Sequence, residues 1–121
     1  MKYFSQFTQL PFLDELSTLN RLNGNTVMLQ ELYQNAMRDL ALHLDRFDAS
    51  IDRGDSKALL FEVQHIRNCA ASIAATQLQF EAEQLENLLQ NHQPLRSGMA
   101  EGFLRQGLHT LESLAHSLRV L

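Results

Sequence analysis

The sequence of 121 residues is poor in residues that cross-link or interrupt a fold: it has no Trp, one Cys, two Pro and five Gly. The single cysteine, Cys69, excludes an internal disulfide and favours a reduced, cytoplasmic protein. The scarcity of Gly and Pro, beside many Leu, Gln, Glu, Ala and Arg residues, favours helices. Because aromatic residues make up only 7% of the chain, its core must consist mainly of Leu and Ala.

Charge and hydropathy exclude further classes of protein. The net charge is −4 and no basic block is present, which argues against nucleic acid as a partner. No stretch approaches the roughly 20 apolar residues of a membrane span. The N-terminus is interrupted by polar residues and lacks the apolar core of a signal peptide. We therefore expect residues 1–121 to form one cytoplasmic domain without membrane or nucleic-acid partners.

Four long segments carry apolar residues at alternating spacings of three and four, which is typical of helices that bury one face. A shorter amphipathic piece precedes them and should lie across one end. Long helices joined by short links favour antiparallel neighbours, so the predicted fold is all-α, an up-down-up-down four-helix bundle. The expected helices cover about residues 12–22, 26–51, 55–73, 76–91 and 97–119.

Helix starts and core positions follow from the same pattern. Asp55 is expected as an N-cap, Thr76 with Gln79 fits a capping box, and Ser97 is expected to cap the last helix. The first long helix is expected to bury Leu29, Tyr33, Ala36, Leu40, Leu44, Phe47 and Ile51, and the third Leu78, Ala82, Leu85 and Leu89. The last helix is expected to turn a leucine-rich stripe inward: Leu104, Leu108, Leu111, Ala115 and Leu118.

The second long helix has the most informative surface. Its expected core stripe is Leu59, Val63, Ile66, Ala70 and Ile73. At about 100° per residue, Gln64 and Asn68 then point almost directly away from the core, while His65 also lies outside but about 100° further round. The neighbouring residues on this surface are Leu60, Phe61, Ala71 and Ser72. An apolar Phe61 here is either an isolated surface residue or part of a docking patch; both interpretations stay open.

Three motifs then follow one another in a fixed order. Gly54 and Asp55 end the first long helix, the run IRNCAASIAA occupies residues 66–75, and Leu85-Glu86 lies in the third long helix. In order and spacing they resemble histidine-phosphotransfer (HPt) domains of bacterial phosphorelays, whose central helix reads roughly H-x-L-K-G-x-A. The resemblance covers about residues 12–92. It implies a signalling module, not an enzyme, that docks on a response-regulator receiver domain or a histidine kinase.

The register of this resemblance puts a glutamine where the family has its phosphorylated histidine. Ile66 falls on the motif leucine, Arg67 on the lysine and Asn68 on the glycine, so the acceptor position falls on Gln64. An amide is not a nucleophile and cannot form phosphohistidine. The resemblance therefore implies a partner-binding surface without phosphate transfer at Gln64. Its residues are Leu60, Phe61, Gln64, His65, Arg67, Asn68, Ala71 and Ser72.

Two alternatives remain. His65 could be the phosphoacceptor of an active phosphotransfer protein, but a shift by one residue would move Ile66, Ala70 and Ile73 off the core, which a packed bundle resists. The chain could instead be a helical adaptor or dimerisation domain outside phosphorelays. That hypothesis expects a larger apolar surface than Leu60 and Phe61 supply.

Other candidate sites are weaker. His65 and Cys69 stand four residues apart, a spacing that two metal ligands could use, but two ligands do not make a site. His109 and His116 share a helix face without obvious partner ligands, and His43 has no evident partner. There is no phosphate-binding glycine loop and no recognisable nucleophile motif. We predict no metal and no cofactor.

Overall fold

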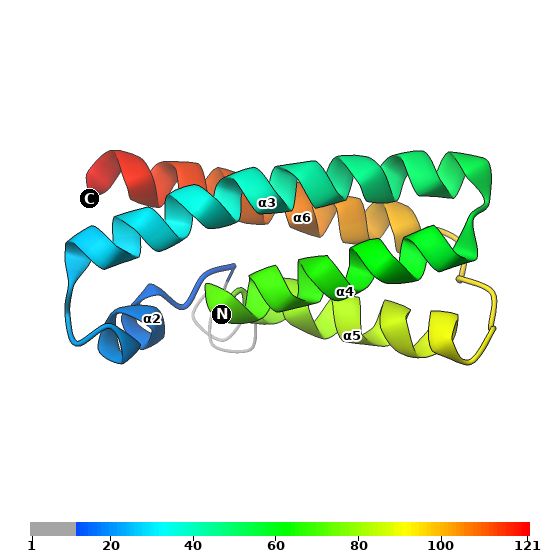
Figure 1. Ribbon diagram of the computed structural model, residues 1–121, viewed down its shortest axis with the longest axis horizontal. Coiled ribbons are helices and arrows are strands. Elements are labelled where there is room, and N and C mark those ends of the chain that lie inside the picture. The colour runs from blue at the N-terminus through cyan, green and yellow to red at the C-terminus, as the bar shows by residue number, and fades with distance from the viewer. Residues whose placement is uncertain (1–11) are drawn as a thin grey trace, which may run out of the picture.

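The structure, a computed structural model, describes residues 12–121, and within this range every regular element is a helix (Figure 1). None of these helices is long and apolar enough to cross a membrane. The short helix α2 precedes four long helices, as predicted. The bounds are α2 Glu15–Arg21, α3 Thr26–Arg53, α4 Ser56–Ser72, α5 Thr76–Gln90 and α6 Met99–Val120.

The four long helices form an up-down-up-down bundle in which consecutive helices run in opposite directions (Figure 1). Helix α3 packs against α4 and α6, and α5 packs against the same two helices from the other side. Helix α2 lies at one end of the bundle and is attached to the end of α4. The Asp14 backbone N–H donates to the Ala74 carbonyl at 2.9 Å, and Arg21 Nη2 donates to the Ser72 carbonyl at 2.9 Å. The predicted all-α bundle with a short helix at one end is confirmed.

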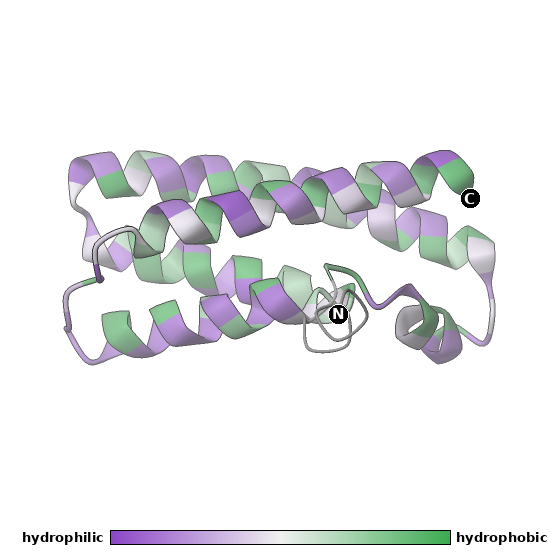
Figure 2. Ribbon diagram, turned by 180° about the vertical axis from the view of Figure 1, so that it is seen from behind, coloured by the Kyte–Doolittle hydropathy of each residue, from purple (hydrophilic) through white to green (hydrophobic). Residues whose placement is uncertain are grey.

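Hydrophobic and hydrophilic residues alternate along every long helix (Figure 2), and the hydrophobic stripes of α3, α4 and α5 form the core as predicted. In α4, Leu59, Val63, Ile66 and Ala70 are buried, followed by Ile73 at the helix end. Burying a large aliphatic side chain of this kind contributes about 1.5–3 kcal/mol. This stripe therefore fixes the rotation of α4 about its axis, and with it the direction of every residue on its surface.

The predicted core of the last helix is wrong by about one residue. Leu108 is exposed and Leu104, Leu111 and Leu118 are only partly buried, whereas Phe103, Gly107, Thr110 and Leu114 face the core. Phe103 packs edge-on against Phe47, with ring centroids 5.1 Å apart. Small residues between the two large ones let α6 lie close to α3. The close approach of α6 to α3 therefore favours small residues at the contact, and the leucine stripe lies at the side of α6, away from the centre of the core.

Two predicted N-caps are also wrong. Asp55 caps α4 as predicted and accepts from the Ala58 N–H at 3.1 Å. At α5, however, the N-cap is Ala75 and not Thr76, because the Ala75 N–H closes the end of α4 on the Ala70 carbonyl and the next helix begins at once. At α6 the N-cap is Gly98 and not Ser97, since the chain turns there at φ 78°, which glycine adopts without strain.

Gly107 marks the closest approach of α6 to α3. A Cβ at this position would lie 2.5 Å from Leu44 Cδ2, inside the contact distance of two carbon atoms. Gly102, one and a half turns earlier on the same helix, has nothing within 4 Å of such a Cβ. The two glycines therefore form a matched pair, one constrained by packing and one not.

We expect Gly102→Ala to raise the free energy of unfolding by about 0.5–1 kcal/mol, because alanine is the better helix former. Gly107→Ala gains the same helix propensity but must displace the buried Leu44, and overpacking costs about 1–3 kcal/mol. It should lower stability by about 1 kcal/mol. Urea denaturation of both variants measures the difference. Equal stabilisation by the two alanines would contradict the close packing at Gly107.

Candidate functional site

The outer surface of α4 is open to solvent over much of the length predicted for it. Phe61 is 51% exposed, and His65, Asn68 and Ala71 are also exposed. Leu60 and Ser72 lie partly buried on its flanks. The directions of these six side chains agree with the helix geometry expected from the sequence. Their role in binding a partner stays a prediction.

Gln64 does not point freely outward as expected. It is partly buried, and its Nε2 donates to Glu86 Oε2 of α5 at 3.1 Å. The other Glu86 oxygen pairs with Arg67 Nη1 at 3.3 Å, and Gln90 Nε2 approaches Oε2 at 3.5 Å. The expectation failed because it treated α4 in isolation, whereas α5 packs along this side and supplies a carboxylate. Gln64, the residue that the sequence resemblance predicts at the HPt acceptor position, is thus held in a network across the α4–α5 seam.

Glu86 is the centre of that network. It is 9% exposed, and its two oxygens bind one cation and accept from two amides. A buried carboxylate needs such partners, because an unpaired charge there would be costly. Beside it an open cleft of about 420 Å³ runs between α4 and α5, lined by Arg67, Phe80, Glu83, Gln84, Glu86, Asn87 and Gln90. The sequence pointed to Glu86 only through the Leu85-Glu86 pair, and it gave no sign of Phe80, which is 50% exposed.

His65 is held in a defined orientation on the side of α4 that faces α3. Its Nδ1 lies 2.9 Å from the Phe61 carbonyl. Since a carbonyl oxygen only accepts, Nδ1 carries the hydrogen, and Nε2 of the neutral ring keeps its lone pair. The His65 ring packs against the Phe61 ring, at a centroid distance of 4.2 Å, and stacks on the His43 ring of α3, at 4.6 Å. His65 is therefore an ordered imidazole with its basic nitrogen away from the backbone.

His43 has a partner after all. Its Nδ1 lies 2.6 Å from Glu62 Oε1, and both side chains are largely buried. The carboxylate therefore fixes the His43 ring that stacks on His65. The sequence analysis missed Glu62 and therefore its pairing with His43, because Glu62 lies at the edge of the core stripe of α4 and His43 at the edge of the core stripe of α3. Only their packing brings them together.

The remaining candidates do not form a metal centre. Across residues 12–121 no three His, Cys, Asp or Glu side chains converge on a point that could hold a metal ion. Burial raises the pKa of the Cys69 thiol to about 11, so it stays protonated at neutral pH. Its Sγ lies 3.6 Å from the Ala36 carbonyl.

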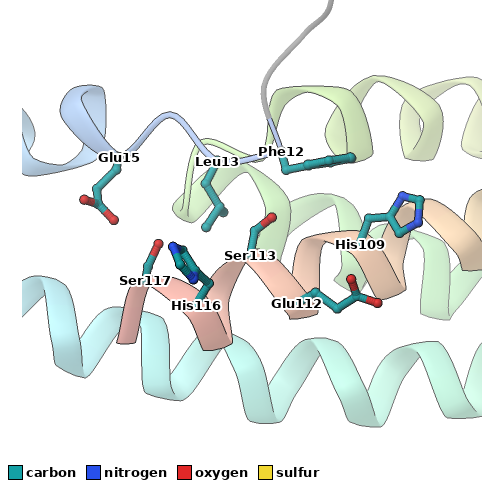
Figure 3. Close-up of a pocket in the computed structure, with 8 residues that line it drawn as sticks. All are labelled: Phe12, Leu13, Glu15, His109, Glu112, Ser113, His116 and Ser117. Atoms are coloured by element: carbon teal, nitrogen blue, oxygen red, sulfur yellow. The ribbon is translucent and has the colours of Figure 1, made fainter. Parts of the chain in front are cut away.

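His109 and His116 do share one face, as predicted, and they line an open pocket of about 730 Å³ together with Phe12, Leu13, Glu15, Glu112, Ser113 and Ser117 (Figure 3). The Phe12 ring packs edge-on against the His109 ring, with the ring centroids 5.4 Å apart. The segment that leads into α2 therefore covers part of α6.

Of the comparisons with known proteins, the one with solved structures found a similar fold. No protein-family model matches the sequence, and no curated protein matches it. Among solved structures, the chain is similar to the HPt domain of a sensor hybrid histidine kinase from Shewanella, with a TM-score of 0.83 and 13% identity over 93% of this chain and 98% of that one. Residues 12–121 thus form a four-helix bundle. More specifically, it has the fold of an HPt domain.

The pairing of His43 with Glu62 gives a testable stability prediction. We expect His43→Ala to lower the free energy of unfolding by about 1–3 kcal/mol, because the buried Glu62 carboxylate loses its hydrogen-bond partner. Urea denaturation of His43→Ala, Glu62→Gln and the double variant isolates the coupling between the two side chains. His116→Ala, an exposed histidine, is the control and should change stability by less than about 0.5 kcal/mol. Additive effects of the two substitutions would refute the coupling.

Proposed function

We propose that this protein is an HPt-like phosphorelay module that docks on a receiver domain or a histidine kinase and carries no phosphate at Gln64. The observation that carries the proposal is the conjunction of two features. The chain has the HPt fold over almost its whole length, yet the acceptor position holds an amide that is bonded to Glu86.

The docking part of the proposal is supported by the α4 surface. Phe61 exposes half of its ring, and Leu60 lies partly buried beside it. Ala71, small and exposed, leaves room for a partner to approach. An exposed aromatic residue among small and polar neighbours is the composition of a protein-binding surface. The proposed docking surface therefore comprises the eight residues predicted above, with Phe80 at its edge.

The loss of phosphate transfer at position 64 follows from its chemistry. The Gln64 side-chain nitrogen is an amide nitrogen without a basic lone pair, and it already donates a hydrogen bond to the Glu86 carboxylate. Arg67, the cation nearest to this position in the chain, is paired with that same carboxylate. A phosphoryl group at position 64 would therefore lie beside an arginine whose charge is already paired and beside the buried negative charge of Glu86, which would repel it. The protein would act by occupying its partner.

A binding experiment tests the docking surface. We expect Phe61→Asp to weaken binding to a cognate receiver domain by about 30-fold or more, the loss of a residue worth 2 kcal/mol or more in an interface. Binding of a panel of receiver domains, each in its phosphorylated and unphosphorylated form, can be measured by titration calorimetry. Leu108→Asp places the same charge on the exposed side of α6 and is the matched control. If Phe61→Asp and the control bind alike, α4 is not the docking surface.

A second candidate function, phosphotransfer through His65, is favoured by one specific observation. The His65 Nδ1 hydrogen is bound to the Phe61 carbonyl, which leaves Nε2 as the nucleophile. In the transfer, the Nε2 lone pair attacks the phosphorus of the receiver's aspartyl phosphate. The N–P bond forms, the P–O bond breaks, and the aspartate leaves as a carboxylate. No shift of the α4 register is then required.

Mixing the protein with phosphorylated receivers distinguishes the two functions. If the protein carries no phosphate, no stable label appears on it, whereas Gln64→His gains label if position 64 faces the receiver's aspartate. If His65 is active, an acid-labile, alkali-stable label appears and is lost in His65→Ala but not in His116→Ala. Mass spectrometry locates the modified residue. Label on His65 would overturn the inactive version and leave the docking surface intact.

A further inference from the structure

The seam between α3 and α6 contains an apolar groove that the proposed docking surface does not use. The groove has a volume of about 550 Å³. Its apolar lining residues are Ala41, Leu42 and Leu44 of α3 and Leu104, Leu108 and Leu111 of α6. Leu42 is 45% exposed and Leu108 55% exposed. They are large aliphatic side chains left in water on both sides of one groove.

The leucines of α6 are exposed because of how that helix is rotated. Its core positions hold Phe103, Gly107, Thr110 and Leu114, so the stripe of Leu104, Leu108 and Leu111 is turned to the side. A helix normally buries its most apolar stripe. Here the core does not take it, and the stripe borders the groove. The groove therefore has an apolar wall that no other part of residues 12–121 covers.

The charges at the groove restrict what can fill it. The two charged residues that line it, Asp45 and Asp48, are both acidic and lie one turn apart on α3. Within residues 12–121 the ion pairs are His43–Glu62 and Arg67–Glu86, so neither aspartate is paired. An occupant that covered the leucines would bring its own rim close to these carboxylates. Basic residues on that rim would complement them, and acidic ones would be repelled.

A second copy of this chain fits these charges poorly. If two identical grooves met about a twofold axis, each would bring its own Asp45 and Asp48 to the same interface. A partner with the opposite charge has no such cost. The groove also lies between two antiparallel helices and is lined by apolar side chains, and an amphipathic helix binds to another protein by laying its apolar face in such a groove.

We propose that the α3–α6 groove binds an amphipathic helix of another protein, with leucine-like side chains toward Leu42 and Leu108 and basic residues toward Asp45 and Asp48. This function goes beyond the proposed docking surface. Helix α6 packs mainly against α3 and α5, and the groove shares no residue with the proposed docking surface on α4. The module could therefore hold a receiver or kinase on α4 and a basic helix on α3 and α6 at the same time.

The absence of Trp from the chain makes the test direct. The probe is a Leu/Lys amphipathic peptide of about 18 residues, or five helical turns, with one Trp on its apolar face. We expect its fluorescence to shift to the blue and to saturate as the full-length protein is added. Leu108→Asp and Leu42→Asp should each weaken binding about 10-fold or more, and the Asp45→Asn/Asp48→Asn variant several-fold. Phe61→Asp, on α4, should bind the peptide like the parent protein.

Each other outcome overturns the proposal. Equal binding of a Leu/Glu peptide of the same pattern would show that the acidic rim does not select its partner. Unchanged binding in both leucine variants, with melting curves like the parent's, would place the peptide elsewhere. A concentration-dependent dimer in sedimentation, dissociated by Leu108→Asp, would make a second copy the occupant. Loss of receiver binding in Phe61→Asp is read separately, so failure of the docking surface and of the groove are distinguishable.

Discussion

The burial of one stripe on α4 determines most of what this protein can present to a partner. Val63, Ile66 and Ala70 have no exposed surface, and turning the helix by one residue would bring them to water. At about 1.5–3 kcal/mol for each large side chain, exposing Val63 and Ile66 alone would cost about 3–6 kcal/mol, which is comparable to the whole stability of a marginal domain. The direction of Gln64 toward α5 and of His65 toward α3 is therefore a consequence of the core.

The two sides of α4 consequently have different chemistry although their residues are neighbours in sequence. On the α5 side, Glu86 binds Arg67 and accepts a hydrogen bond from Gln64, the amide that the proposal places at the HPt acceptor position. On the α3 side, the His65 ring is stacked on His43, which is itself fixed by Glu62. On the α5 side the Arg67 charge is paired and the Gln64 amide is hydrogen-bonded, whereas on the α3 side an ordered imidazole keeps the lone pair of its Nε2. The two proposed functions thus depend on adjacent residues, Gln64 and His65, which lie about 100° apart around the helix.

Helix α6 illustrates a different constraint. Its apolar residues cover more than one face, and hydrophobicity alone would bury the leucines. The core instead accepts Phe103 and Leu114 with Gly107 and Thr110 between them, because α6 lies too close to α3 for a large side chain opposite Leu44. The displaced leucines form one wall of the α3–α6 groove. Close packing in one place thus creates an exposed apolar surface in another.

The sequence by itself determined the helical class, the number and order of the helices, the core stripes of α3 to α5 and the outward direction of Phe61, Asn68 and Ala71. These depend on periodicity within a single helix, which is a local property. Only the tertiary structure decided the face that α6 buries, the bond between Gln64 and Glu86 and the stacking of His43 on His65. Those depend on the neighbouring helix, its distance and its side chains, and periodicity carries no information about them.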